Sequence, residues 1–190
     1  RDAHIGSLDA VVDGVPEQVR ERIGELFDDE LVDLGLGAGD HQVNVFVGLA
    51  TDLPHDAREP LQFVFNDGAR RLGVLTDAGM LTEYLCAHLQ DLHALVLECN
   101  HDREMLANSA YPWSLKQRIG GDFGHLANDI AGMILARVRH DALHTVVAAH
   151  LSKQNNTPLL AAEAIAVPLG ARTEDVPIAD QEEGLLWCTV

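Results

Sequence analysis

The stretch Arg71-Leu72-Gly73-Val74-Leu75-Thr76-Asp77-Ala78-Gly79 decides the fold that we predict for this chain. Its apolar run ends abruptly in Asp77, and small residues follow. This pattern predicts a buried strand that carries a carboxylate at its tip, with little bulk beside it. Such a tip suits metal coordination or acid–base chemistry.

Three other apolar runs lead into polar groups in the same way. Residues 45–47 lead after a short bridge to His55, residues 94–97 lead to the polar segment 98–102, and residues 145–149 lead to His150. If these strands lie side by side, their tips form one crevice, which is where open α/β sheets bind ligands. A single polar strand end means little, because loops face water. The repetition is what favours a functional site.

The order of the predicted elements indicates an α/β (α+β) fold with a mixed sheet. Asp67-Gly68 between two apolar segments predicts a β-hairpin over residues 61–76, and alternation predicts a half-buried strand over residues 42–47. Helical segments then alternate with the strands at 94–97 and 145–149. The 190 residues fit a single domain, residues 1–190.

Two of the predicted helices have identifiable ends. We expect Asn128 to cap one helix, whose inward face is formed by Ile130, Met133, Ile134 and Val138. Asn156 or Thr157 is expected to cap the next helix, which should end before Pro168.

Composition limits the possible partners and compartments. The net charge of −17 repels nucleic acid at long range, so binding to it would need a local basic surface. No apolar run approaches the roughly 20 residues of a membrane span, so we expect no membrane partner. Cys86, Cys99 and Cys188 are scattered and odd in number, which favours a reducing compartment and predicts a cytoplasmic protein.

His55, Asp77 and His150 are the candidate metal ligands, because they occupy equivalent strand-tip positions. Imidazole nitrogen and carboxylate oxygen suit Zn²⁺ or Mn²⁺. A carboxylate can bridge two ions, and two ions about 4 Å apart can hold a phosphoryl group while activating water.

A second candidate region is the glycine-containing segment 124–128, which opens a helix. Backbone N–H groups there could bind a phosphate, with His125 and Asn128 adding contacts. An ordinary glycine turn with an Asn cap explains the same residues equally well.

Polar residues are densest at 98–102, directly after a buried strand. Glu98 or Asp102 could orient a metal-binding histidine, and Asn100 and His101 are candidates for contacts with substrate, His101 also with metal. Alternatively, Asn100 or Asp102 simply caps a helix. The motifs GxSxG, GxGxxG, HExxH and the P-loop are absent, which disfavours serine hydrolases, Rossmann enzymes and NTPases.

Six ordered segments resemble metallo-β-lactamase fold hydrolases of the bacterial WalJ (YycJ) type. They are Pro54-His55-Asp56-Ala57-Arg58-Glu59-Pro60, Leu75-Thr76-Asp77, Leu97-Glu98-Cys99-Asn100-His101-Asp102, Tyr111-Pro112-Trp113-Ser114-Leu115-Lys116-Gln117-Arg118, Gly124-His125-Leu126, and Ala149-His150-Leu151-Ser152 with Asn155-Asn156-Thr157-Pro158. The likeness runs from about residue 43 to Gly184.

The resemblance implies an αββα sandwich with a two-metal site at one edge. It implies that His55 binds one metal ion, that Asp77 bridges both and that His150 binds the second. A hydroxide activated by the metal ions would attack phosphorus, with Asp77 and His125 in catalytic roles and His125 at the scissile phosphate. Proteins of this type are thought to be DNA 5′-exonucleases, and related branches cleave RNA or small phosphodiesters.

The chain departs from the family in one major respect. The resemblance implies an HxHxDH motif upstream of His55, which supplies most metal ligands. This motif is absent, and we expect the first strands of the sandwich to be missing as well. We therefore expect either an N-terminally truncated piece of an enzyme or a degenerate homologue, and we expect weak metal binding and little hydrolysis by this chain alone. Ala127 stands where the family has Ser, a smaller departure.

Three functions remain open from the sequence. The first is a metal-dependent phosphodiester hydrolase acting on DNA, and the second is a small-molecule phosphodiesterase, which suits the net charge of −17 better. The third is a metal-poor binding or regulatory homologue without catalysis. The sequence gives no oligomeric state.

Overall fold

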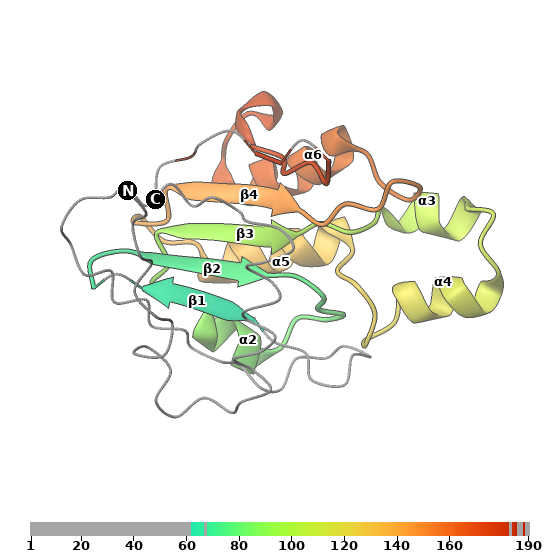
Figure 1. The fold of residues 1–190 in the computed structure, drawn as a ribbon, viewed down its shortest axis with the longest axis horizontal. Coiled ribbons are helices and arrows are strands. Elements are labelled where there is room, and N and C mark those ends of the chain that lie inside the picture. Colours follow the sequence, from blue (N-terminus) through green and yellow to red (C-terminus); the bar gives the residue numbers. More distant parts are fainter. Residues whose placement is uncertain (1–61, 67, 183, 186–187, 189–190) are drawn as a thin grey trace, which may run out of the picture.

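A four-stranded mixed sheet in the order β1-β2-β3-β4 organises the chain (Figure 1). The computed structural model describes residues 62–66, 68–182, 184, 185 and 188, so the predicted strand at 42–47 and His55 lie outside it. β1 (Phe63–Asn66) is antiparallel to β2 (Arg71–Leu75). β3 (Ala94–Glu98) and β4 (Thr145–Ala149) run parallel to β2.

The predicted hairpin is confirmed, and its turn explains why. Asn66 pairs with Arg71 across the end of the two strands. Gly68 has a φ of 94°, which glycine adopts without a steric penalty, and its N–H donates to Oδ1 of Asn66 at 2.8 Å. The Asn66 side chain and the glycine together close the turn.

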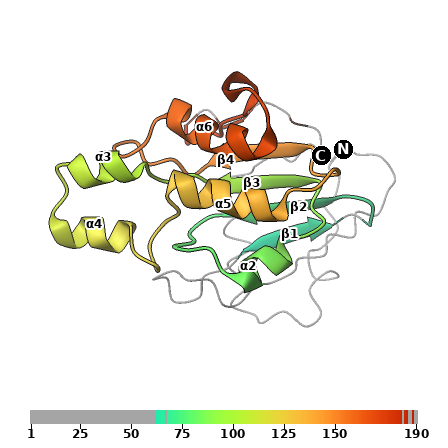
Figure 2. The ribbon, with the colours of Figure 1, turned by 180° about the vertical axis from the view of Figure 1, so that it is seen from behind.

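Three helices cover one face of the sheet, as Figure 2 shows from behind. They are α2 (Glu83–His88), α5 (Asn128–Val138) and α6 (Pro158–Leu169). Their apolar side chains form one core with alternate strand residues, among them Leu75, Leu97 and Ala148, all 0% exposed. A short 3-10 turn, η2 (Thr173–Asp175), follows α6.

Two further helices lie beyond the C-terminal ends of the parallel strands. α3 (Arg103–Asn108) and α4 (Trp113–Ile119) project away from the sheet in both ribbon views (Figures 1 and 2). Neither helix contributes to the large core. Leu106 of α3 is buried, but outside that core. No helix in the described residues is both long and apolar enough to cross a bilayer.

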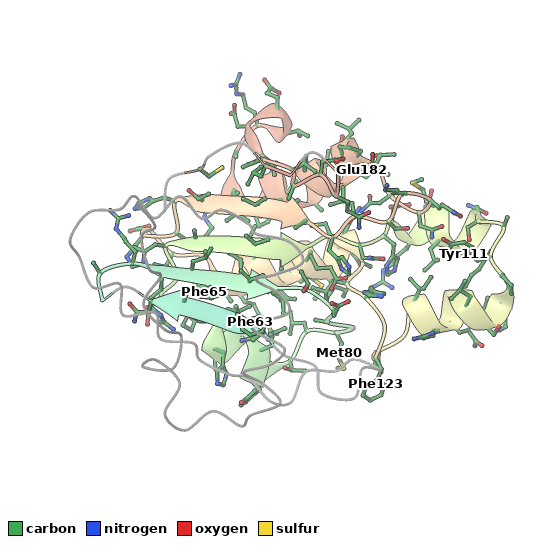
Figure 3. All side chains as sticks on the ribbon, in the orientation of Figure 1. Phe63, Phe65, Met80, Tyr111, Phe123 and Glu182 are labelled. Carbon is green, nitrogen blue, oxygen red and sulfur yellow. The ribbon has the colours of Figure 1, made fainter. Side chains whose placement is uncertain are left out.

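The sheet face opposite the helices carries a second set of apolar side chains. Phe63 pairs with Val74, and Val74 pairs with Val96, so the three side chains share this face. The rings of Phe63 and Phe65 stack on it with centroids 6.2 Å apart (Figure 3). Apolar side chains on both faces are what the predicted α/β class requires of a sheet with parallel strands.

Two details of α5 correct the prediction. Asn128 is the first helical residue and not the cap; Ala127 holds the cap position and makes no side-chain hydrogen bond. The buried face comprises Asn128, Ala131, Ile134, Leu135 and Val138, whereas Met133 is 52% exposed. Packing against α6 decides the face: a Cβ at Gly132 would lie 2.9 Å from the carbonyl oxygen of Ala164, so the two helices approach closely there.

The predicted end of α6 is also wrong. Thr157 caps its start, as expected, through a hydrogen bond from the Leu160 N–H. The helix continues through Pro168 to Leu169 and ends at Gly170, which has a φ of 65°. Proline is tolerated because it lies in the last turn, where its missing N–H costs only one terminal bond and glycine completes the cap.

Candidate metal centre

The parallel register brings three predicted site residues to one edge of the sheet. Leu75 pairs with Leu97, so Asp77, two residues on, lies beside the end of β3. Glu98 pairs with Ala149, the residue before His150. The tips of β2, β3 and β4 therefore meet, as the sequence predicted.

His125 reaches the same edge through a non-local pairing. The N–H of Asn100 donates to the Leu126 carbonyl at 3.0 Å, and the N–H of Asn128 donates to the His101 carbonyl at 2.9 Å. Residues 125–128 thus run alongside the continuation of β3. The His125 N–H also donates to the carbonyl of Ile119 at 2.9 Å, which joins it to the end of α4.

Asp77, Glu98, His125 and His150 form a compact cluster, with ligand atoms all within 4.8 Å of one another. The Nδ1 atoms of His125 and His150 lie 2.9 Å and 2.8 Å from the same Glu98 oxygen, Oε1. Asp77 Oδ1 lies 3.5 Å from His125 Nδ1 and 4.0 Å from His150 Nδ1. Nitrogen- and oxygen-bearing side chains gather at this end of the sheet in Figure 3.

Glu98 is the buried centre of the cluster, with a side chain that is 0% exposed. Burial alone would raise the pKa of its carboxyl. Hydrogen bonds from His125, from His150 and from the Ala78 N–H, which donates to Oε2 at 3.0 Å, outweigh burial and hold the pKa below its usual value. Glu98 is therefore a carboxylate whose two oxygens are both engaged.

The two histidines are oriented by this carboxylate. The hydrogen bond to Glu98 raises the pKa of His150, even though burial opposes the charged ring. When Nδ1 donates to a carboxylate, Nε2 is the ring nitrogen that can coordinate an ion, and its orientation is fixed. The side chains of His125, His150 and Asp77 are 27%, 31% and 48% exposed, so the cluster opens to solvent on their side.

Strained backbone supports two of the four side chains. Asp77 has a φ of 58° and His150 a φ of 57°, a left-handed conformation that residues with a Cβ seldom adopt. Such conformations persist where the surrounding structure enforces them, and they concentrate at functional sites. The loop after Asp77 is closely packed, since a Cβ at Gly79 would lie 2.2 Å from the carbonyl oxygen of Asp122.

Asn100 and Asp102, which were also predicted at the site, have backbone partners. The side-chain amide of Asn100 donates to the His150 carbonyl at 3.0 Å, which fixes the loop that carries His150. Asp102 caps α3 by accepting the Met105 N–H at 2.9 Å. The helix-cap alternative for Asp102 is thus the one that the structure shows, and its role in orienting a histidine stays a prediction.

His101 and Asn128 are buried beside the cluster and not part of it. His101 is 1% exposed, and burial lowers the pKa of its imidazole to about 4. Its Nδ1 atom has no hydrogen-bond partner in the part of the chain that is described. Asn128 is 7% exposed and exchanges two side-chain hydrogen bonds with Asn156, each 2.9 Å long. Direct substrate contact by either residue remains an untested prediction.

Sequence reasoning placed His125 at a substrate phosphate and did not expect it in the ligand cluster. The sequence feature that could have indicated this position of His125 is Gly124. A Cβ at Gly124 would lie 2.2 Å from the carbonyl oxygens of Arg118 and Ile119. This glycine lets the turn after α4 fold tightly enough to bring His125 inward. The two imidazoles and the Asp77 carboxylate suit a borderline ion such as Zn²⁺ or Mn²⁺, so these donors fit a divalent metal.

Comparison with known proteins defines the class. The fold matches the metallo-β-lactamase fold protein YhfI from Bacillus subtilis with a TM-score of 0.53 and 16% identity, over 74% of this chain and 48% of that one. The matched part of the chain, 74% of its length, therefore has the metallo-β-lactamase fold. No protein-family profile matches the chain.

Two sequence relatives are more specific. The chain is 38% identical over 123 residues to exodeoxyribonuclease YycJ of Bacillus anthracis, which is 65% of this chain and 45% of that protein. It is 34% identical over 107 residues to exodeoxyribonuclease WalJ of Streptococcus pneumoniae D39, which is 56% of this chain and 40% of that protein. The chain is thus related to WalJ (YycJ)-type proteins, as its motifs predicted, and the matches span less than half of their length.

Proposed function

We propose that this chain carries part of the active site of a metal-dependent phosphodiester hydrolase that acts on DNA as an exonuclease. The observation that carries the proposal is the four-residue cluster at the strand tips, two of whose members have a left-handed backbone. The relatives named exodeoxyribonuclease support the choice of substrate.

We assign different roles to the members of the cluster. Asp77 and His150 would hold a divalent ion, together with His55, which lies outside the described residues; Asp77 would bridge if two ions bind. Glu98 would orient His150 and His125 through their Nδ1 atoms. His125 would either complete the ligand set or contact the phosphate. A bound ion would polarise the phosphoryl group and lower the pKa of a water molecule.

Hydrolysis of two substrates tests this proposal. Purified chain with saturating Mn²⁺ or Zn²⁺ should degrade a 5′-phosphorylated DNA duplex slowly, because its metal-ligand set is incomplete, and Asp77→Asn should abolish this residual reaction. The exposed Glu163→Gln on α6 is the matched control and should leave it unchanged. No hydrolysis by a chain that binds the ion tightly would overturn the proposal.

A small phosphodiester is the second candidate substrate, and the net charge of −17 favours it. Hydrolysis of bis(p-nitrophenyl) phosphate without hydrolysis of the duplex would select this alternative. If neither substrate reacts and no ion binds, the chain fits the metal-poor binding homologue instead.

A further inference from the structure

Two exposed aromatic side chains lie on α4 and on the turn that joins α4 to the metal centre. Trp113, the first residue of α4, is 73% exposed, and Phe123, in the turn after α4, is 63% exposed. Figure 3 shows Phe123 close to Met80, which agrees with the tight packing of Gly79 on Asp122. Large aromatic rings exposed to water on a segment that is joined to a candidate catalytic centre indicate a ligand-binding surface.

The same region differs from the rest of the chain in charge. Residues 105–121 contain no Asp or Glu, but include Lys116 and Arg118 in a chain with a net charge of −17, and the turn adds one carboxylate, Asp122, beside Phe123. Lys116 is anchored, since its Nζ atom donates to the Ala107 carbonyl at 2.6 Å and thereby ties α4 to α3. A lysine side chain that is held in one place is suited to an anionic ligand.

Backbone contacts connect this surface directly to the cluster. The His125 N–H is bonded to Ile119, the last residue of α4, and the turn with Phe123 packs on the loop that follows Asp77. Ile119 lies six positions after Trp113, so the two residues are about 9 Å apart along the helix axis. Stacked nucleotides rise about 3.4 Å each, so α4 has the length of roughly three bases.

We propose that α4 and the turn after it bind a single strand of nucleic acid, with bases stacked on Trp113 and Phe123 and phosphates near Lys116. Base–aromatic stacking is tolerant of sequence and works together with positive charge along the backbone. The surface would hold the strand whose terminal phosphate reaches the metal centre. The ligand class rests on the proposed function, whereas the location of the surface rests on exposure and charge.

Tryptophan fluorescence tests the proposal without catalysis. In a Trp187→Phe background Trp113 is the only tryptophan, and an oligothymidylate titrated in EDTA should quench its emission. Anisotropy of a labelled oligothymidylate should show about 10-fold weaker binding for Trp113→Ala and for Phe123→Ala. Lys116→Gln should reduce the salt dependence of binding by about one phosphate contact.

Controls use exposed apolar residues on α6, outside the proposed surface. Leu159→Ala and Val167→Ala on α6, which remove side chains of residues 61% and 82% exposed, should leave binding unchanged. Absence of quenching, or unchanged affinity in Trp113→Ala, overturns the proposal. So does a dimer in light scattering that Trp113→Ala converts to monomer, because the surface would then bind a second copy of the chain.

This test is independent of the hydrolase assignment. Loss of hydrolysis with intact quenching would sink the hydrolase proposal and leave the binding surface. Hydrolysis of bis(p-nitrophenyl) phosphate without any oligonucleotide binding would overturn the binding surface and leave a phosphodiester hydrolase.

Discussion

Asp77 and His150, 73 residues apart in sequence, have almost the same backbone torsion, with φ values of 58° and 57°. Both residues follow the end of a parallel strand, and both side chains enter the same cluster. A left-handed conformation costs an L-residue about 1–2 kcal/mol. The fold therefore accepts strain at two points in order to turn these side chains toward Glu98.

Replacing Asp77 by glycine should make the protein more stable and less able to bind metal. Relief of the strain, offset by the backbone entropy of glycine, should raise the free energy of unfolding by about 0.5–1 kcal/mol. Urea denaturation measures this change, and calorimetric titration with Mn²⁺ measures the loss of binding. Asp91→Gly is the matched control, because Asp91 also has a φ of 58° and lies outside the cluster. It should give the same gain in stability with unchanged metal binding; a loss of stability in both variants would show that neither backbone is strained.

Glu98→Gln should weaken metal binding without changing the shape of the cluster. The amide keeps the volume of the carboxylate but removes the charge that orients His125 and His150, so affinity for Zn²⁺ or Mn²⁺ should fall about 10–100-fold. Mispaired groups in a fully buried position should also cost about 1–3 kcal/mol of unfolding free energy. Glu163→Gln on the surface of α6 serves as control for both measurements. Unaltered affinity in Glu98→Gln would show that Glu98 does not orient the ligands.

The Asn128–Asn156 pair should be strongly coupled. Asn156 also donates to the carbonyl of Cys99 at 2.6 Å, so it links the end of β3 with the starts of α5 and α6. Asn156→Ala leaves buried partners unsatisfied and should cost about 2–4 kcal/mol. A double-mutant cycle with Asn128→Ala should give a coupling energy of about 0.5–3 kcal/mol. The exposed Asn108→Ala should change stability by less than about 0.5 kcal/mol; additive effects at 128 and 156 would contradict the hydrogen-bonded pair.

His101 should make stability depend on pH. Its pKa lies at about 4 because burial, and next the charge of Arg103, disfavour the imidazolium. The unfolded chain binds the proton below about pH 6.5, whereas the folded protein does not until pH is near 4. The contribution of the neutral ring is therefore full above the unfolded pKa and falls by roughly 3 kcal/mol as pH drops to the folded one. Urea denaturation of wild type and His101→Gln between these pH values should show a steeper loss for wild type; parallel curves would contradict it.

The sheet and part of the centre were predictable because they depend on local patterns. The Asp-Gly turn and the buried apolar runs located β1 to β4, and the parallel strand ends placed Asp77 near His150. The place of His125 was not predictable in this way, because it depends on residues 125–128 pairing with the chain beyond β3. The left-handed backbone torsions of Asp77 and His150 could not be predicted either, because the presence of an Asp or a His does not by itself indicate a positive φ.

Helix packing accounts for the remaining differences. The buried side of α5 is set by its close approach to α6 at Gly132, which no property of the α5 sequence alone reveals. The Asn128 side chain likewise turned out to bind Asn156, a residue 28 positions away. The ligand roles of His55, Asp77 and His150 stay predictions until an ion is titrated.

Glu98 and Ala149 are paired across two parallel strands, so the geometry of the cluster depends on the register between β3 and β4. A slip of one residue between β3 and β4 would turn the Glu98 carboxylate to the other side of the sheet, away from the imidazole of His150. A divalent ion would then bind only the correctly aligned protein and would raise its melting temperature by mass action. The ion would in that way select among folded states as well as take part in chemistry.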